Sequence, residues 1–332
     1  MKEDDIRPEA LFRRYLALTR RDARTYFADA PRKHVPCPAC RNEEGTILFK
    51  KSGFIFEECP ACGTLYANPR PAPEVFNHYY ESAPSIEFWA THFYKETEDS
   101  RRKLLIRPKA ERVNAILKKY APAVKPGDCV IDIGAGYGVF CQELAAITKN
   151  RPEVIAVEPS PGLQEVCRQK RIPTIGKFFE QVTKEDLEGK RIIAATSFEL
   201  LEHLADPDAF IGSCHTVLPK GALQVLTTLN WHGFDLQVLR QRSRSIQPPA
   251  HINFFNPASL RILLERNGFS VLEVTTPGKL DVDIVAKQAG DIRCEFISRL
   301  IETSNEAARQ KFQEFLQESK MSSHMMIVAR RD

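Results

Sequence analysis

The stretch VIDIGAGYGVF at residues 130–140 places a buried strand, a glycine-rich turn and the start of a helix in direct succession. Three glycines in one turn allow a sharp reversal and a close approach of a ligand to the main chain. Around it, short apolar runs alternate with helical patterns, which is typical of a largely parallel sheet with helices on both faces. We expect the last strand, which follows a long helical segment, to enter antiparallel. The expected strands are residues 128–133, 153–158, 172–175, 191–197, 222–229, 269–276 and 323–330, and the expected helices are 108–120, 138–148, 162–170, 206–217 and 257–267.

The residues in and beside this turn favour a cationic ligand over a dinucleotide. Gly134, Gly136 and Gly138 depart from the dinucleotide spacing, because Val139 occupies the position of its last glycine. Asp132 precedes the turn, and its carboxylate would repel a pyrophosphate but attract positive charge. S-adenosylmethionine, an adenosine compound with sulfonium and ammonium groups, fits this description.

A second acidic residue lies at the spacing expected of a ribose-binding carboxylate. Glu158 ends the second expected strand, 26 residues beyond Asp132, near the spacing at which an acid meets ribose hydroxyls. On these features, residues 108–332 resemble the class I S-adenosylmethionine-dependent methyltransferases. The resemblance implies a Rossmann-like α/β fold whose seven-stranded sheet has the order 3-2-1-4-5-7-6. It also implies cofactor binding by Asp132, Gly134, Ala135, Gly136, Tyr137, Gly138, Glu158, Pro159 and Phe198.

Four of the nine cysteines form two Cys-x-x-Cys pairs with 18 residues between them, which is the spacing of a zinc ribbon. The intervening segments 46–49 and 54–56 would form the ribbon hairpin, and four thiolates would complete a closed structural site. A redox role is the competing interpretation. The expected zinc ligands are Cys37, Cys40, Cys59 and Cys62, in a ribbon over residues 34–70, and we expect Cys129, Cys141, Cys167, Cys214 and Cys294 to be buried small hydrophobes.

The end of the fourth expected strand carries Glu199, Glu202 and His203. This spacing is similar to that of the ubiquinone-biosynthesis O-methyltransferases, whose corresponding residues hold a divalent ion. The resemblance therefore implies a Mg²⁺ site here, since carboxylates suit hard cations. Alternatively, Glu202 and His203 cap the following helix or hold the loop.

A third resemblance lies at His251, in the sequence His-Ile-Asn-Phe-Phe that follows the fifth strand. A zinc module joined to a methyltransferase core looks like the deoxysugar C-methyltransferases, in which a histidine at this place serves as base, preceded by a glutamate where this chain has Ala250. Histidine suits proton abstraction near neutral pH. His251 and His203 are therefore the candidate general bases, with Glu202 beside them.

Further segments could contact the acceptor. Residues 230–250 are too long for a tight connection and form a candidate lid, whose arginines could grip phosphates. Residues 71–107 are expected to form an aromatic-rich linker or cover. Residues 1–33 include a basic helix. Residues 286–320 are expected to form a helical insertion. The candidate substrate-binding residues are Tyr79, Tyr80, His232, Arg240, Arg242 and Arg244, with core packing or an exposed basic loop as the alternatives.

The overall charge of +4 is too small to indicate nucleic acid or an anionic membrane as the partner. No apolar run reaches the length of a membrane span, and the N-terminus lacks the apolar core of a signal peptide, so we expect a cytoplasmic protein. The favoured function is methyl transfer to a hydroxyl or carbon of a nucleotide-linked or phosphorylated sugar. The alternatives are a zinc-containing ribosomal RNA methyltransferase, for which the basic residues 101–119 would contact phosphates, and a non-catalytic docking protein that binds the cofactor.

Overall fold

A seven-stranded sheet forms the centre of the protein, as the computed structural model shows for residues 1–183, 185–187 and 189–332. Its strands in chain order are β6 (Asp128–Ile133), β7 (Glu153–Val157), β8 (Thr174–Ile175), β9 (Arg191–Phe198), β10 (Leu223–Leu229), β12 (Phe269–Thr275) and β13 (His324–Arg331). They lie in the order β12-β13-β10-β9-β6-β7-β8, and β13 runs antiparallel to both of its neighbours. The predicted strand order 3-2-1-4-5-7-6 and the antiparallel last strand are confirmed.

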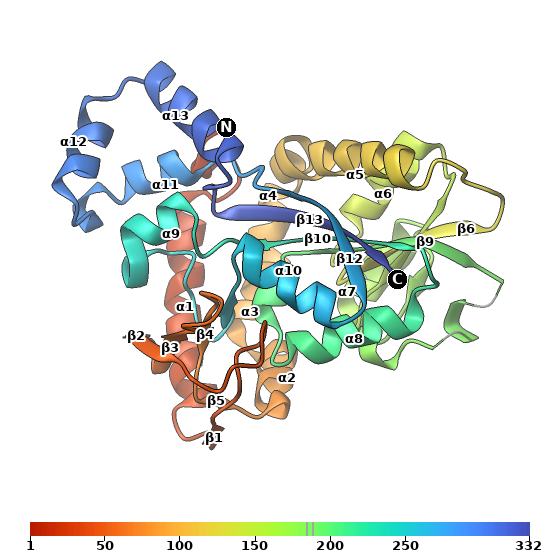
Figure 1. Ribbon diagram of the computed structural model, residues 1–332, viewed down its shortest axis with the longest axis horizontal. Coiled ribbons are helices and arrows are strands. Elements are labelled where there is room, and N and C mark those ends of the chain that lie inside the picture. The colour runs from red at the N-terminus through yellow and green to blue at the C-terminus, as the bar shows by residue number, and fades with distance from the viewer. Residues whose placement is uncertain (184, 188) are drawn as a thin grey trace.

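Helices cover both faces of this sheet, because its strands are apolar on both sides (Figure 1). Every residue of β6 is buried, as expected of a central parallel strand. One cluster of buried side chains joins the sheet to α5 (Arg107–Tyr120), α6 (Val139–Thr148) and α7 (Pro161–Gln169). A second cluster joins the opposite face to α8 (Pro207–Val217) and α10 (Pro257–Arg266).

The N-terminal ribbon forms a second sheet that includes a strand from the core. The predicted hairpin is present as β2 (Thr46–Lys51) and β3 (Phe54–Glu58), which pair antiparallel. Next to them lie β4 (Leu65–Ala67) and then β11 (Asn253–Phe254), a short strand that follows His251 in the chain. The short strands β1 (Arg32–Lys33) and β5 (Arg70–Pro71) pair beside this sheet. The ribbon is therefore joined to the core by main-chain pairing.

The N-terminal helix packs against the cover segment. A buried aromatic cluster of Phe12, Tyr15, Phe88 and Phe93 joins them. The cover itself is almost wholly helical and is interrupted by π-helical turns at Trp89–Phe93 and Arg102–Ile106, a distortion often found near functional sites. The helices are α1 (Glu9–Phe27), α2 (Pro73–Ser82), α3 (Pro84–Phe88) and α4 (Tyr94–Arg101), preceded by the 3-10 turn η1 (Glu3–Asp5).

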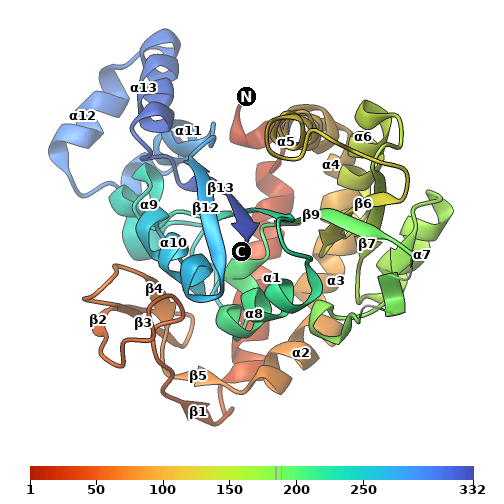
Figure 2. The same ribbon diagram turned by 45° about the vertical axis from the view of Figure 1, so that its right-hand side comes forward.

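Residues 230–250, the candidate lid, are tied to the rest of the molecule. This segment contains α9 (Phe234–Leu239), and its side chains Trp231, Leu236 and Ile246 are buried among the ribbon and cover aromatics. The predicted helical insertion projects from the body beside α9 (Figures 1 and 2). Its two helices are α12 (Glu295–Thr303) and α13 (Glu306–Glu318), and they follow α11 (Asp281–Lys287), which lies almost wholly before the predicted bounds 286–320.

The five cysteines outside the ribbon were expected to be buried. Cys129, Cys141, Cys167 and Cys214 are buried as expected, whereas Cys294 is exposed, because it lies just before α12 on the projecting segment. None of the helices described is long and apolar enough to cross a membrane.

The start of β13 packs tightly against the N-terminus of α9, and this contact predicts the effect of a glycine substitution. A methyl group on Gly233 would collide with the main chain of Ser323, so we expect Gly233→Ala to lower the free energy of unfolding by about 1–3 kcal/mol. Gly290→Ala is the matched control, since its methyl group meets no atom within 4 Å. Chemical denaturation of both variants tests the packing; equal stability of the two would contradict it.

Candidate functional site

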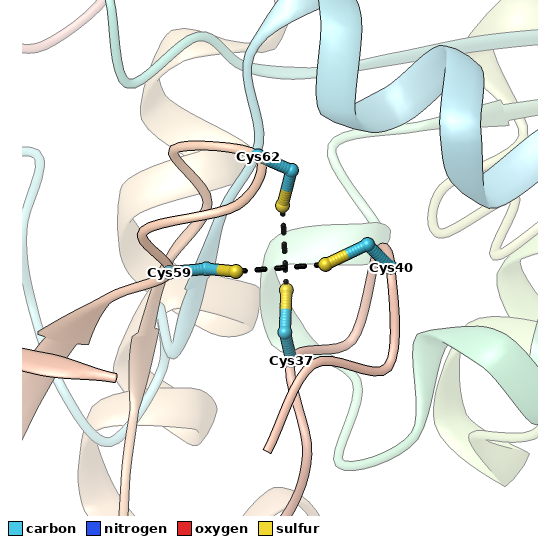
Figure 3. Close-up of side chains that lie close together, drawn as sticks. All are labelled: Cys37, Cys40, Cys59 and Cys62. Carbon is cyan, nitrogen blue, oxygen red and sulfur yellow. Dashed lines mark hydrogen bonds between the residues drawn. The ribbon is translucent and has the colours of Figure 1, made fainter. Parts of the chain in front are cut away.

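The four ribbon cysteines converge on one point, as Figure 3 shows. The sulfur of Cys37 lies 3.5 Å from that of Cys62, and the sulfur of Cys40 lies 3.5 Å from that of Cys59. All four ligand atoms lie within 4.8 Å of one another, and none of the cysteines forms a disulfide. This donor set suits a tetrahedral zinc ion with no open coordination position, so its contribution would be structural.

Two equivalent turns bring the sulfurs together. The amide of Arg41 donates to the carbonyl of Cys37, and the amide of Gly63 donates in the same way to that of Cys59. Both residues have left-handed backbones, with φ of 65° at Arg41 and 68° at Gly63. Glycine adopts this conformation without strain, whereas arginine does so at a cost that the turn must offset.

The ribbon holds the loop that carries His251. The amide of Ala67 donates to the carbonyl of Ile252, and the amide of Ile252 donates to the carbonyl of Glu202. The main chain of Ile252 is therefore bonded to the ribbon on one side and to the end of β9 on the other. Asn253, the next residue, donates through its side chain to the carbonyls of Leu201 and Leu204.

The glycine turn after β6 has the features of a ligand cradle. Gly136 has φ of 56°, and a Cβ at this position would meet no atom within 4 Å, so one side of the turn is open. Its amide donates to Glu158 over 2.8 Å, and Glu158 also accepts from the amide of Ser160. The predicted acid and the predicted turn are thus in direct contact, although they lie on different strands.

Asp132 lies beneath this turn in a buried environment. Its carboxyl accepts a 2.7 Å hydrogen bond from the hydroxyl of Thr196. Burial raises the pKa of Asp132 to about 7, although the bonds from Thr196 and Cys141 and the charge of Lys109 oppose the shift. Burial likewise raises the pKa of Glu158. A cationic ligand would favour the charged form of both carboxyls.

The cover segment lies over the glycine turn. The ring of Tyr137 stacks on that of Tyr94 in α4, with centroids 4.3 Å apart and planes 3° from parallel. The hydroxyl of Tyr137 donates to the carbonyl of Ala90, and Lys170 donates to the carbonyl of Tyr137 and to Glu98 in α4. Residues of the predicted cover are therefore in contact with the predicted cofactor turn.

The remaining predicted cofactor residues surround the same turn. The amides of Gly134 and Ala135 donate to the carbonyl of Val157 at the end of β7, and the carbonyl of Pro159 accepts from a side-chain amide. Phe198, at the end of β9, packs edge-on against Phe140, with centroids 4.6 Å apart.

Glu202, His203 and His251 form a compact group at the ends of β9 and the ribbon-bound loop. Their ligand atoms lie within 4.8 Å of one another. The Nδ1 atom of His203 lies 2.8 Å from the carbonyl of Ala250, and the Nδ1 atom of His251 lies 2.7 Å from that of Ser245. If each Nδ1 donates to its carbonyl, both neutral rings carry their lone pairs on Nε2.

Burial sets the ionisation in this group. Burial and the charge of Glu199 raise the pKa of Glu202 to about 8, and Glu202 accepts a 2.7 Å bond from Thr228. Burial lowers the pKa of His203, and burial together with His203 lowers that of His251 to about 3. At neutral pH this is an uncharged group of one carboxyl and two imidazoles. Such a set could also hold a divalent ion, and its imidazoles favour zinc or iron over magnesium.

Glu199 lies outside this group, contrary to the expected Glu199–Glu202–His203 set. Its φ of 51° directs the chain so that the carboxylate accepts from Thr227 and contacts Nε2 of His324, both at 2.6 Å. Burial opposes its charge, but His324 and Lys109 hold the pKa of Glu199 well below its usual range. Nor do Glu202 and His203 cap α8, since Asp206 does so by accepting from the amide of Ala209.

His324 and Lys109 were not predicted as site residues from the sequence. His324 begins β13, and because this strand is antiparallel, its first residue pairs with Leu229 at the end of β10. Lys109 lies in the first turn of α5, with its Nζ 4.5 Å from the Phe198 ring centroid and 3.9 Å from Glu199. Neither has a local motif; the expected antiparallel entry of the last strand was the only available signal for His324.

The candidate substrate residues lie in different surroundings. The hydroxyl of Tyr80 reaches the carbonyl of Ala250 and lies 3.3 Å from Nδ1 of His203, so Tyr80 belongs to the imidazole group. Tyr79 is fully buried and bonded to Ser85, which makes it a core residue. His232 is exposed and lies against Gly63 of the ribbon.

The three arginines of the candidate lid do not converge on one place. Arg240 lies over the ring of Trp231, Arg242 donates to the carbonyl of Asp291, and Arg244 pairs with Glu9 over 2.8 Å. Each guanidinium contacts another part of the protein, so the structure does not support the binding of one phosphate by all three arginines.

Comparisons with known proteins agree with this geometry. The profile of a methyltransferase domain matches residues 102–274. The ubiquinone biosynthesis O-methyltransferase of Bradyrhizobium sp. (strain ORS 278) is 28% identical over 137 residues, which cover 38% of this chain and 52% of that protein. The same enzyme of Xanthomonas axonopodis pv. citri (strain 306) is 28% identical over 174 residues, covering 49% of this chain and 70% of that protein. The chain thus spans about half the length of the first relative.

Among solved structures, the magnesium protoporphyrin IX methyltransferase of Synechocystis PCC 6803 aligns with 79% of this chain and all of its own length, at 14% identity and a TM-score of 0.49.

The cysteine cluster predicts a metal-dependent ribbon. We expect Cys59→Ser to lower the bound zinc to well below one ion per chain and to lower the unfolding temperature, because three thiolates no longer close the tetrahedron. Cys294→Ser is the matched control, since this cysteine is exposed and outside the cluster. Metal analysis of both purified variants checks the assignment, and unchanged zinc content in Cys59→Ser would refute it.

The raised pKa of Asp132 predicts a pH-dependent stability. Between about pH 4 and pH 7 the folded protein retains a proton on Asp132 that the unfolded chain releases, so this residue's contribution to stability falls as pH rises. The Asp132→Asn variant has no titratable group at this position, so it does not lose this contribution to stability as pH rises. We expect the unfolding free energy of the variant, relative to the parent, to increase by roughly 2–4 kcal/mol from pH 4.5 to pH 7.5. Urea denaturation at both pH values tests this, and a constant difference would contradict the shift.

Proposed function

This chain belongs to the class I S-adenosylmethionine-dependent methyltransferases, and on that premise we propose that it transfers the methyl group of S-adenosylmethionine to a hydroxyl oxygen or a carbon of a small acceptor. The observation that carries the proposal is the direct contact of Glu158 with the open glycine turn, above the buried carboxyl of Asp132. The imidazoles of His203 and His251 lie at the end of β9, two strands away from the acid of β7.

The residues around the turn fit the cofactor. Gly136 leaves space for an adenosine group to approach the main chain, since a Cβ there would meet nothing within 4 Å. Glu158 would accept from the ribose hydroxyls, and Asp132 would favour the positive charge of the methionine part. Tyr137, Pro159 and Phe198 would supply apolar contacts. When bound, the cofactor supplies an electrophilic methyl group.

Methyl transfer requires an acceptor lone pair in line with the methyl carbon, and a group that takes the acceptor proton. We propose that Nε2 of His251 or of His203 takes this proton. The backbone carbonyls of Ser245 and Ala250 hold the two rings through Nδ1, and these contacts would partly offset the burial that disfavours the imidazolium formed on proton uptake. Glu202 would then offer a carboxyl beside the new charge. Tyr80 would help to position the ring of His203.

Within this class we favour a nucleotide-linked or otherwise phosphorylated sugar as the acceptor. The combination of a cysteine ribbon with this core, and the position of His251, support it by resemblance to the deoxysugar C-methyltransferases. The ubiquinone biosynthesis O-methyltransferases instead suggest O-methylation of a hydroxyl compound of that pathway. Both acceptor types require the same proton transfer.

The two alternatives have less support. The basic segment 101–119, which would contact RNA, uses several of its charges internally: Arg102 binds Glu98 and Glu143, and Lys119 binds Glu273. A non-catalytic docking protein would not need two imidazoles held by backbone carbonyls beside a buried carboxyl.

Titration with S-adenosylhomocysteine tests the cofactor site. We expect Glu158→Ala to weaken binding at least tenfold, because the ribose loses its acceptor and the glycine turn loses its support. The matched control is Glu165→Gln, an exposed acid on the neighbouring helix α7, which should bind like the parent protein. Wild-type affinity in Glu158→Ala would overturn the assignment.

A panel of nucleotide-sugars and catechols, offered with radiolabelled S-adenosylmethionine, then identifies the acceptor class. His251→Asn should abolish labelling of the accepted compound and leave S-adenosylhomocysteine binding unchanged. Labelling at the parental rate would remove His251 from the role of base.

A further inference from the structure

Three cationic side chains meet at the junction of the N-terminal segment, the cover and the core. Arg7 follows η1, Arg101 ends α4, and Lys109 lies in the first turn of α5. The guanidinium of Arg101 reaches the carbonyl of Ile6 at 3.5 Å, so the first two cations come from contacting segments. Glu199 faces both Arg101 and Lys109 and partly offsets the effect of burial, which lowers the pKa of each.

The cations of this group are incompletely paired. No carboxylate oxygen of the described residues lies within 4.0 Å of the Arg101 guanidinium, and its buried Nε has no hydrogen-bond partner there. The buried Nε of Arg7 likewise has none, and its nearest acid, Glu3, lies 3.6 Å from Nη1. An unsatisfied buried donor costs free energy that a ligand oxygen would recover.

The acids nearby do not balance these charges. Glu199 is already bonded to His324 and Thr227. Burial and the neighbouring Asp281 raise the pKa of Asp235 to about 8, so this carboxyl, which faces Arg7, is largely uncharged at neutral pH. Lys109 also faces Asp132 and Glu202, whose carboxyls accept hydrogen bonds from Thr196 and Thr228. The incompletely paired donors of the group are therefore those of Arg7 and Arg101.

The group lies between the two parts of the proposed site. Arg101 is held over the rings of Trp89 and Tyr94, with its central carbon 5.6 and 5.4 Å from their centroids, and Tyr94 stacks on Tyr137 of the glycine turn. On the other side, Nζ of Lys109 lies 3.9 Å from Glu199 and 4.5 Å from the ring centroid of Phe198, at the end of β9 that precedes His203. A ligand bound here would be next to both the cofactor turn and the imidazoles.

We propose that Arg7, Arg101 and Lys109 bind an anionic group of the acceptor, a phosphate or a carboxylate. The inference rests on the proposed methyltransferase function and names the chemistry of its substrate. The planar fork of arginine binds two oxygens at once, and the aromatic rings hold Arg101 in place before the ligand arrives. This assigns anion binding to residues of the N-terminal segment, the cover and the start of the core, in place of Arg240, Arg242 and Arg244.

Titration of the full chain with inorganic pyrophosphate and with malonate tests the proposal, both with and without bound S-adenosylhomocysteine. We expect at least one of the two anions to bind, and Arg101→Gln to weaken that binding about tenfold or more, since charge-assisted hydrogen bonds are lost. Arg101→Lys retains the positive charge but loses the planar fork of donors. Its affinity for the anion should therefore lie between those of the parent protein and Arg101→Gln. Tighter binding of pyrophosphate would assign a phosphate, and tighter binding of malonate a carboxylate.

Arg102→Gln is the matched control. It removes the same charge from the adjacent residue, but Arg102 is fully engaged with Glu98, Glu143 and Gln142. The proposal is overturned if neither anion binds the parent protein, if Arg101→Gln binds as the parent does, or if Arg102→Gln loses as much affinity. S-adenosylhomocysteine binding, measured in every variant, reports the fold and the cofactor site separately. Loss of anion binding with retained S-adenosylhomocysteine binding supports the proposal.

Discussion

The backbone of Ile252 links two parts of the molecule that are far apart in the sequence. Its carbonyl accepts from Ala67 of the ribbon, and its amide donates to the carbonyl of Glu202 after β9. Arg70 strengthens the same junction through bonds to Asn253 and to the carbonyl of Ala205. Because His251 precedes Ile252 directly, the position of this imidazole depends on the ribbon being folded. A metal ion bound by the four cysteines would therefore influence the imidazole group without taking part in its chemistry.

Burial separates the roles of the carboxyls at the edge of the sheet. Glu199 and Glu202 are three residues apart, yet one is held ionised by His324 and Lys109 while the other has a pKa raised to about 8. Two neighbouring carboxyls whose environments push their pKa values apart are a common arrangement in acid–base sites. Burial likewise raises the pKa of Asp132 to about 7. A bound positive charge would therefore shift this carboxyl to its ionised form at neutral pH.

The cover segment explains how an N-terminal extension can contribute to a site built on a sheet edge. Its π-helical turns lie at both ends of α4, and from this helix Tyr94 contacts the glycine turn. The aromatic cluster around Phe12 and Phe93 anchors α1 to the same segment. As a result, the side chains of Arg7 and Arg101 are carried to the region between the turn and His251.

Hydrophobic periodicity predicted the strands and helices of the core, and spacing predicted the cysteine cluster and the acid Glu158, because short-range geometry controls these patterns. The strand order 3-2-1-4-5-7-6 instead followed from the resemblance to the class I methyltransferases. The set expected at Glu199, Glu202 and His203 was wrong in one member, because the positive φ of Glu199 is a backbone feature that no spacing reveals.

Only the tertiary structure decided which side chains from distant elements meet. His251 joins Glu202 through the pairing of β11 with β4, and His324 reaches Glu199 because β13 enters the sheet antiparallel. Arg7 and Arg101 come together through the packing of α1 on the cover. These encounters depend on long-range packing and strand register, and a single sequence contains no local signal for either.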